Sequence, residues 1–429
     1  MQPVAAATAG LDRDVPQSPK QPQPNRQSSV AFGDQVGAIP KAVIADRWRL
    51  AYGLTGTTCM SPAPVTPALP TVWLIRIAGI FADSEADILR TLGAESLKKL
   101  GSEYLLIRLG DPALLRTSAA AKFVRWNLPI HHSWPCCPAD IPGFVEKAAR
   151  ALARKFGGKP PQAIMVGALD PGGSNRYYRT LASNLRGRTL QLFPAAVAAL
   201  RDAEAQDPRA TSLFCLVGKE GLFCGMQSPA DSNGFYPGGT KFIRQNDPAT
   251  ISRAGAKIAE ALHQLQLDRP PPPAGSHWLE LGASPGGMTT ELLARGYRVT
   301  AVDRAPLDPR LAHAHGLRSV VADAATFHPA QGTTYDALLS DMNGDPLEAL
   351  AQVIRLAKHL RHGGLVVFTL KLPGVATFAE ANAVEAAVVA KAAAAGLRVF
   401  ARTHLTYNRH EFTLFFDPLA RFLAARKNL

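Results

Sequence analysis

The stretch Trp278-Leu-Glu-Leu-Gly-Ala-Ser-Pro-Gly-Gly-Met288 decides the fold. An apolar-rich run leads into a glycine-rich turn, and the residues that follow, up to Ala294, have the composition of a helix start. A strand, a tight loop and a helix in this order form the first unit of a doubly wound α/β nucleotide site. The sequence therefore predicts an α/β, Rossmann-like domain that binds its ligand at this loop.

The spacing of the glycines indicates the class of ligand. We expect Gly282, Gly286 and Gly287 to let the backbone approach a ligand where a Cβ would collide. The pattern G-x-x-P-G-G lacks the third glycine of the dinucleotide fingerprint, so a pyrophosphate is not the expected ligand. Glu280 adds a carboxylate beside the loop, which favours a cationic or zwitterionic nucleoside. These residues predict S-adenosylmethionine as the cofactor.

The chain has 429 residues and a formal net charge of +13. This excess indicates a polyanionic partner, nucleic acid rather than membrane, although a basic but otherwise ordinary enzyme is the alternative. The five cysteines form no C-x-x-C pair, so we expect reduced thiols and a cytoplasmic location. His131 and His132 lie near Cys136 and Cys137, but no second ligand pair follows, and no metal site is predicted.

Composition predicts three parts along the chain. Residues 1–70 are rich in Pro, Gln and Ser, which predicts a disordered extension, and a translation start nearer Met60 is an alternative. Residues 71–230 mix expected strands and helices, as in a small α+β domain. Residues 231–429 contain the α/β domain.

The uncharged run from Leu50 to Ile75 contains four prolines, which argues against a membrane helix there.

One basic window indicates contact with RNA. No acidic residue lies between Asp170 and Asp202, and two tyrosines stand among the cations. Cations for phosphates and aromatic faces for unstacked bases suit single-stranded RNA, while a solvated basic helix face is the alternative. The arginines expected to bind RNA are Arg176, Arg179, Arg186 and Arg188.

Polar side chains follow four apolar runs of the α/β domain. Asp303, Asp323, Asp341 and Lys371 each come directly after an expected strand, so they should line one crevice at the carboxyl ends of the sheet. Asp303 is expected to accept hydrogen bonds from ribose hydroxyls, and Asp323 from the adenine amino group. Their alternatives are a helix N-cap for Asp303 and a cap or turn for Asp323.

Two lysines and two carboxylates form a second expected site. Lys257 lies on a predicted helix, Asp341 and Lys371 follow strands, and Glu411 opens a strand. If they converge, they form a set for taking a proton from a weakly acidic hydroxyl. The alternative is four unrelated surface charges.

At this point the sequence resembles a known family. The order Lys257, Asp341, Lys371, Glu411 is similar to the K-D-K-E tetrad of FtsJ-like RNA ribose 2′-O-methyltransferases. The chain is most similar to the RlmM type, which methylates the 2′-OH of a cytidine in bacterial 23S rRNA. The matching segments are Gly282 to Gly287, Ser340 to Met342, Leu370 to Pro373, Arg409 to Thr413 and Phe235 to Gly239. The resemblance covers about residues 210 to 418, is weaker over 71 to 210 and is absent over 1 to 70. Met288 stands where relatives commonly carry Trp.

The resemblance implies a cofactor site, a catalytic site and an RNA-binding region. It implies a THUMP-like region at 71–230 and an FtsJ-like, S-adenosylmethionine-dependent methyltransferase domain at 231–429. The implied catalytic residues are the tetrad, with Lys371 as the general base or as the group that orients the ribose hydroxyl. The implied cofactor-binding residues are Glu280, Gly282, Ser284, Pro285, Gly286, Gly287, Met288, Asp303, Asp323 and Asp341.

The protonation state of Lys371 is open at this stage. The pKa of a lysine is ordinarily about 10.4. Burial and Lys257 would lower the pKa of Lys371, whereas Asp341 and Glu411 would raise it.

Two alternatives to rRNA methylation also stay open: a different RNA such as tRNA or a cap, and a catalytically silent assembly factor. The sequence predicts no oligomeric state.

Overall fold

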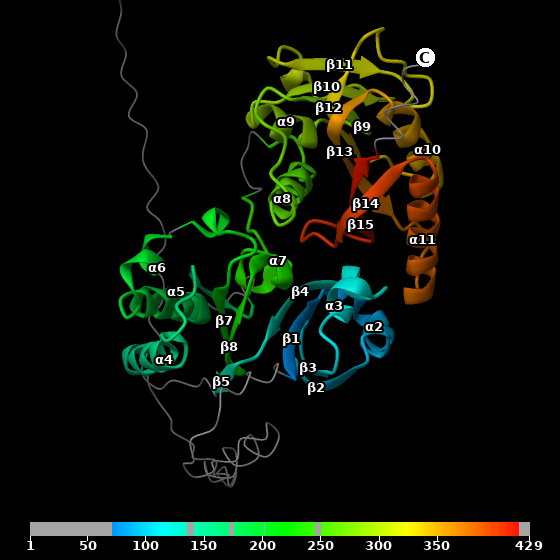
Figure 1. Ribbon diagram of the computed structural model, residues 1–429. Helices are drawn as coiled ribbons and strands as arrows, with labels where there is room; N and C mark the ends of the chain where they lie inside the picture. The colour runs from blue at the N-terminus through cyan, green and yellow to red at the C-terminus, as the bar shows by residue number, and fades with distance from the viewer. Residues whose placement is uncertain (1–70, 135–140, 171–175, 201, 245–249, 420–429) are drawn as a thin grey trace, which may run out of the picture. The chain divides into compact units, whose positions relative to one another are not determined.

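The computed structural model describes residues 71–134, 141–170, 176–200, 202–244 and 250–419, which all lie in one compact unit, Ala68–Leu429. Within these residues the strands form three sheets, two of four strands and one of seven (Figure 1). The expected extension at 1–70 lies outside the described residues.

The first sheet is built from the first four strands, in the order β2-β3-β1-β4 with antiparallel pairing. Its strands are β1 (Val72–Ile77), β2 (Ala94–Leu100), β3 (Tyr104–Leu109) and β4 (Val124–Pro129). Its helices are η1 (Gly79–Ser84), α2 (Glu85–Thr91), α3 (Leu114–Thr117) and η2 (Ala121–Phe123). α2 has Ser84 and Leu92 as its end residues, and the Ser84 side chain makes no capping hydrogen bond because this residue has helical backbone angles.

The second sheet has the order β5-β8-β7-β6. Its strands are β5 (His132–Trp134), β6 (Ile164–Ala168), β7 (Ser212–Gly218) and β8 (Gly221–Gln227). β7 and β8 pair as an antiparallel hairpin. α4 (Ile141–Phe156) and α5 (Arg176–Leu190) bury their apolar faces against β6 and β7 in one core. We expected a small α+β domain at 71–230, and the strands of this region are divided between two sheets.

Four shorter helices lie between α5 and the seven-stranded sheet in the chain, two of them before β7 and two after β8. They are α6 (Ala195–Ala199), η3 (Ala203–Ala205), α7 (Pro229–Ser232) and η4 (Pro237–Gly239).

The third sheet has the order β11-β10-β9-β12-β13-β15-β14, and all pairs are parallel except those of β15. Its strands are β9 (His277–Leu281), β10 (Arg298–Asp303), β11 (Leu317–Val321), β12 (Tyr335–Ser340), β13 (Leu360–Lys371), β14 (Leu397–Thr403) and β15 (Glu411–Pro418). The α/β, Rossmann-like fold expected from the sequence is confirmed for this part.

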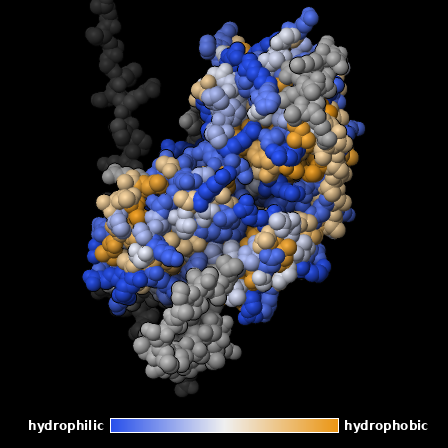
Figure 2. Space-filling model, viewed as in Figure 1, coloured by the Kyte–Doolittle hydropathy of each residue, from blue (hydrophilic) through white to orange (hydrophobic). Residues whose placement is uncertain are grey.

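Helices cover both faces of this sheet. Leu279 and Leu281 pack with α10 (Pro346–Ala357) and α11 (Phe378–Ala394) on one face. Trp278 packs with α8 (Gly255–Leu265) and α9 (Gly287–Ala294) on the other. Burial on both faces is the reason that these strands read as continuous apolar runs. The alanine-rich α11 lies at the right of Figure 1, where Figure 2 shows hydrophobic residues.

The first sheet shares a core with the third. Phe81 stacks on Phe412 with 5.5 Å between ring centroids, and Phe123 meets the same ring edge-on at 5.1 Å. The buried Lys122 forms an ion pair of 2.5 Å with Glu385 of α11. β15, which begins at Glu411, therefore packs against residues that accompany the first sheet as well as against the rest of the seven-stranded sheet.

Candidate active site

The glycine loop connects β9 to α9, as the sequence predicts. Gly282 has a φ of +78°, and a Cβ there would lie 2.9 Å from the backbone nitrogen of Met342. At Gly287 a Cβ would lie 2.1 Å from the hydroxyl oxygen of Ser252. The closest neighbours of these two positions are thus protein atoms rather than open space. We expected these glycines to admit a ligand, and in the structure they also let neighbouring chain segments approach.

Other loop residues hold the turn together. The Ser284 hydroxyl donates to the carbonyl of Pro306, and the carbonyl of Pro285 accepts from the amide of Asp308 at 2.9 Å. Met288 is buried in the core between the sheet and α8, so its side chain packs inside the domain.

Glu280 is buried beneath α9. Its Oε2 accepts a hydrogen bond of 2.7 Å from the Thr289 hydroxyl. Burial raises the pKa of Glu280 to about 8, with Asp341 and Asp303 adding to the rise. The carboxyl is therefore largely neutral at pH 7. The expected electrostatic argument, in which a charged Glu280 selects a cationic ligand, is wrong for this structure because the side chain points into the helix packing.

Asp303 and Asp323 both stand at strand ends, and each makes a short-range turn. The two oxygens of Asp303 accept hydrogen bonds from the amides of Ser284, at 3.0 Å, and Ala305, at 2.8 Å. Asp323 accepts from the amide of Ala325 at 2.8 Å. The bond to Ser284 fixes the Asp303 carboxylate against the glycine loop, which suits a role beside a bound nucleoside. Their roles toward ribose and adenine stay predictions.

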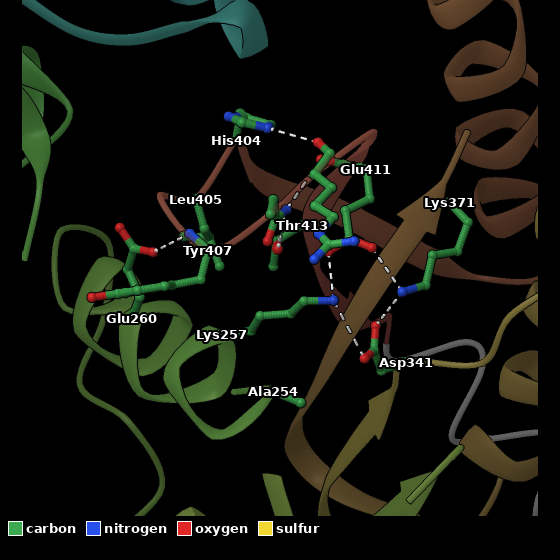
Figure 3. A network of polar contacts seen from close by, with 12 residues as sticks. Ala254, Lys257, Glu260, Asp341, Lys371, His404, Leu405, Tyr407, Glu411 and Thr413 are labelled. Atoms are coloured by element: carbon green, nitrogen blue, oxygen red, sulfur yellow. Dashed lines mark hydrogen bonds and ion pairs between the residues drawn. The ribbon is translucent and has the colours of Figure 1, made fainter. Parts of the chain in front are cut away.

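The two lysines and two carboxylates converge in a closed ring (Figure 3). Lys371 Nζ lies 2.7 Å from Asp341 Oδ1 and 2.7 Å from Glu411 Oε2. Lys257 Nζ lies 2.5 Å from Glu411 Oε1 and 3.5 Å from Asp341 Oδ2. Each charge therefore has two neighbours of opposite sign. The alternative of four unrelated surface charges is wrong.

The fold explains why the ring forms. Asp341 follows the central strand β12, Lys371 ends β13, and Glu411 begins β15 directly opposite Lys371 in the antiparallel register. α8 brings Lys257 to the same edge. The ring borders a pocket of about 830 Å³ lined by Lys257, Lys371, Glu411 and the residues of the loop from Thr406 to His410. A substrate in this pocket can therefore approach both lysines and the Glu411 carboxylate.

The charges in the ring set the protonation state of Lys371. Its burial favours the neutral amine, but the contacts with Asp341 and Glu411 outweigh burial, and the pKa of Lys371 is raised. The carboxyl of Glu411 is also buried, yet the two lysines hold its pKa below the ordinary value. Lys371 is thus an ammonium and Glu411 a carboxylate at neutral pH. This answers the question that the sequence left open.

The loop between β14 and β15 contributes residues that sequence reasoning missed. The Tyr407 amide donates to Glu260 Oε2 at 3.2 Å (Figure 3). Arg125 of β4 donates to the backbone carbonyls of His404 and Leu405. Burial raises the pKa of Glu260. No sequence motif marks these residues, because they meet only when distant segments pack together.

The basic window lies on α5. Arg176 and Arg179 are exposed, whereas Arg186 donates to the carbonyl of Ile164 at 3.0 Å. Arg188 forms an ion pair of 2.6 Å with Glu146 of α4. The two arginines in the first turn are therefore better placed to meet an outside partner than the two in the last turns.

Two of the five cysteines lie within the described residues. Cys215 and Cys224 are free thiols on adjacent strands, while Cys136 and Cys137 lie outside the described residues. No group of three or more His, Cys, Asp or Glu that suits a metal ion occurs in the described part of the chain. Likewise, none of its helices combines the length and apolar character needed to cross a membrane.

Part of the chain is similar to a known protein family. Residues 250–391 match the family model described as FtsJ-like methyltransferase. This segment is therefore similar to FtsJ-like methyltransferases, in agreement with the resemblance that the sequence shows.

The curated relatives carry a more specific name. Ribosomal RNA large subunit methyltransferase M of Halorhodospira halophila is 36% identical over 138 residues, which cover 32% of this chain and 40% of the relative. The protein of that name from Methylococcus capsulatus is 30% identical over 231 residues, covering 52% and 62%. The one from Cellvibrio japonicus is 29% identical over 210 residues, covering 48% and 58%. The matches thus span between 40% and 62% of these relatives.

Proposed function

We propose that this chain is an S-adenosylmethionine-dependent RNA ribose 2′-O-methyltransferase that acts on a cytidine of 23S rRNA. The observation that carries the proposal is the closed ring of Lys257, Asp341, Lys371 and Glu411 beside an open pocket. Relatives named as large subunit rRNA methyltransferases support the choice of RNA.

The cofactor would lie at the glycine loop. Asp303, fixed by the amide of Ser284, presents a partly exposed carboxylate at the end of β10, as a ribose ligand requires. The buried Ser340 hydroxyl, at the end of β12, has no hydrogen-bond partner among the described atoms. Both features fit a polar ligand at this edge of the sheet. When bound, S-adenosylmethionine supplies an electrophilic methyl group.

The tetrad would position the ribose hydroxyl. Because the pKa of Lys371 is raised, its ammonium first donates a hydrogen bond to the 2′-oxygen and holds it in line for attack. Lys371 acts as a base only in the fraction that has lost its proton. Lys257 holds Glu411 from the opposite side, so the ring keeps its geometry when the hydroxyl enters.

We further propose that residues 71–230 are a THUMP-like RNA-binding region and that 231–429 hold the catalytic domain. The exposed Arg176 and Arg179 and the net charge of +13 support an RNA partner. Binding of rRNA would place the protein in the cytoplasm, as the cysteine content also predicts.

A methyl-transfer assay tests the proposed function. Purified full chain, total RNA from cells lacking the gene and radiolabelled S-adenosylmethionine should yield label in 23S rRNA, and the mapped product should be a 2′-O-methylcytidine. Lys371→Ala should abolish transfer while cofactor binding by calorimetry is kept. Lys358→Ala is the matched control, since Lys358 is an exposed lysine of the same domain. Label in tRNA would redirect the proposal, and absence of transfer would favour an assembly factor.

A further inference from the structure

Phe242 exposes its ring to solvent from a short segment whose other residues are held in place. Its side chain is 86% exposed, and only Ile80 and Val321 share this status among the large hydrophobic residues of the described chain. Exposure of an isolated aromatic ring has a cost in hydration free energy. A rigidly held, exposed phenylalanine is therefore a candidate contact for a ligand.

The neighbours of Phe242 are anchored on both sides. Lys241 forms an ion pair with Glu204, and Thr240 accepts a hydrogen bond from Arg76. The Ile243 amide donates to the Tyr407 hydroxyl at 2.8 Å, and that hydroxyl donates to the Ile243 carbonyl at 3.2 Å. These bonds fix the backbone that carries the exposed ring.

The anchor connects this segment to the catalytic pocket. Tyr407 lines the pocket together with Lys257 and Lys371. Its amide is bound by Glu260, which lies one turn after Lys257 on α8 (Figure 3). Phe242 is therefore fixed relative to the helix that supplies one member of the tetrad.

We propose that Phe242 is a stacking platform for an unstacked RNA base near the nucleotide whose ribose enters the pocket. This rests on the proposed RNA substrate. A flat aromatic face binds any base by stacking, and cations beside it bind the phosphates. Arg244, two residues away, is exposed, and no ion pair links it to another described residue. A single ring beside the exposed Arg244 suits RNA better than a protein partner, which needs a larger apolar patch.

Three substitutions of Phe242 in the full chain test the platform. Phe242→Ala and Phe242→Leu should raise the Kd for a single-stranded RNA oligonucleotide roughly 5- to 100-fold, because stacking is lost. Phe242→Trp should keep the affinity within a few-fold, and its added fluorescence should be quenched by RNA. KM for RNA should rise more than kcat falls. Val321→Ala is the control, since Val321 is an exposed apolar residue on the edge strand β11.

The outcomes separate this inference from the proposed function. Equal affinity of the leucine variant and the unsubstituted chain would overturn stacking, and so would unchanged affinity in all three variants. Unchanged RNA affinity with weakened binding to a ribosomal particle would assign Phe242 to a protein contact and also overturn it. If the unsubstituted chain transfers no methyl group but Phe242→Ala still weakens RNA binding, the proposed function fails and the platform stands.

Discussion

The guanidinium of Arg125 and the ring of His404 are joined by a buried hydrogen bond, with 2.8 Å between Nη2 and Nδ1. Burial, together with the nearby Arg125, lowers the pKa of His404 to about 3, so the ring is neutral. Since arginine can only donate, Nδ1 accepts and Nε2 carries the proton, which it donates to the Arg409 carbonyl at 3.0 Å. The imidazole of His404 thus connects β4 to the loop that precedes Glu411.

Replacement of Arg125 should therefore damage both stability and catalysis. Arg125→Met leaves three buried acceptors, on His404 and Leu405, without their donor, at a cost of about 3 kcal/mol in the free energy of unfolding. A loosened loop should also lower kcat in the methyl-transfer assay. Urea unfolding and single-turnover rates provide the measurements. Arg108→Met is the control, because Arg108 pairs with Glu95 on the surface of the same sheet. Equal losses in the two variants would contradict the role of the loop.

The pH dependence of methyl transfer should follow Lys371. Its raised pKa means that the neutral amine, the form able to accept a proton, increases as pH rises toward that pKa. In Asp341→Asn one of the two raising carboxylates is gone, so the pKa of Lys371 falls and the rate profile should shift to lower pH, although its maximum should drop. Single-turnover rates between about pH 6 and pH 10, roughly the range in which a lysine begins to lose its proton, measure this shift. An unshifted profile would leave Lys371 with an orienting role alone.

The stability of the domain should depend on pH through Glu280. Its pKa is about 8 in the folded chain, against an ordinary value of 4.5. Because the folded chain favours the neutral carboxyl, Glu280 makes its full contribution to stability at pH values below its pKa in the unfolded chain. This contribution is lost as pH rises from that value to about 8. Between pH about 5.5 and 8 the loss is at most roughly 3 kcal/mol. The variant Glu280→Gln keeps a donor and acceptor for Thr289 but does not titrate.

Urea unfolding of both proteins at several pH values checks this prediction. The difference in free energy of unfolding between the unsubstituted chain and Glu280→Gln should decrease with rising pH and level off above about 8. A difference that is constant over this range would show that Glu280 is charged in the folded state.

The active-site edge could be predicted from sequence because its residues follow strands. Asp341 and Lys371 come directly after apolar runs, and parallel strands place such residues at one edge. The charge state of Glu280 was misjudged because the alternation of side chains within β9 directs Glu280 toward α9. The sequence does not show that the Thr289 hydroxyl donates a hydrogen bond to it there. The edge strand β2 was missed because its charged residues face solvent and conceal its pattern.

The close approach of α9 to the segment before α8 predicts a size limit at Gly287. The Cβ of Gly287→Ala would lie 2.1 Å from the Ser252 hydroxyl oxygen and 3.0 Å from its carbonyl, so the glycine loop must shift. Stability and cofactor affinity should both fall, and Ser252→Ala in the same chain should restore part of each. Thermal unfolding and calorimetry measure the two effects. Gly187→Ala on α5 is the control, because nothing lies within 4 Å of its added Cβ. Full stability of Gly287→Ala alone would contradict the limit.

The arginines of α5 should separate into two groups by their response to salt. Arg176 and Arg179 are exposed, so replacing both with methionine should weaken RNA binding and reduce the slope of log Kd against log salt by roughly 1 to 2. Arg188 is paired with Glu146, and its contact, with that of Arg150, lowers the pKa of Glu146 to about 2. Arg188→Met should therefore lower thermal stability and leave the slope unchanged, because its charge is already matched between α4 and α5. A slope that falls for Arg188→Met but not for the double variant would place the RNA at the other end of the helix.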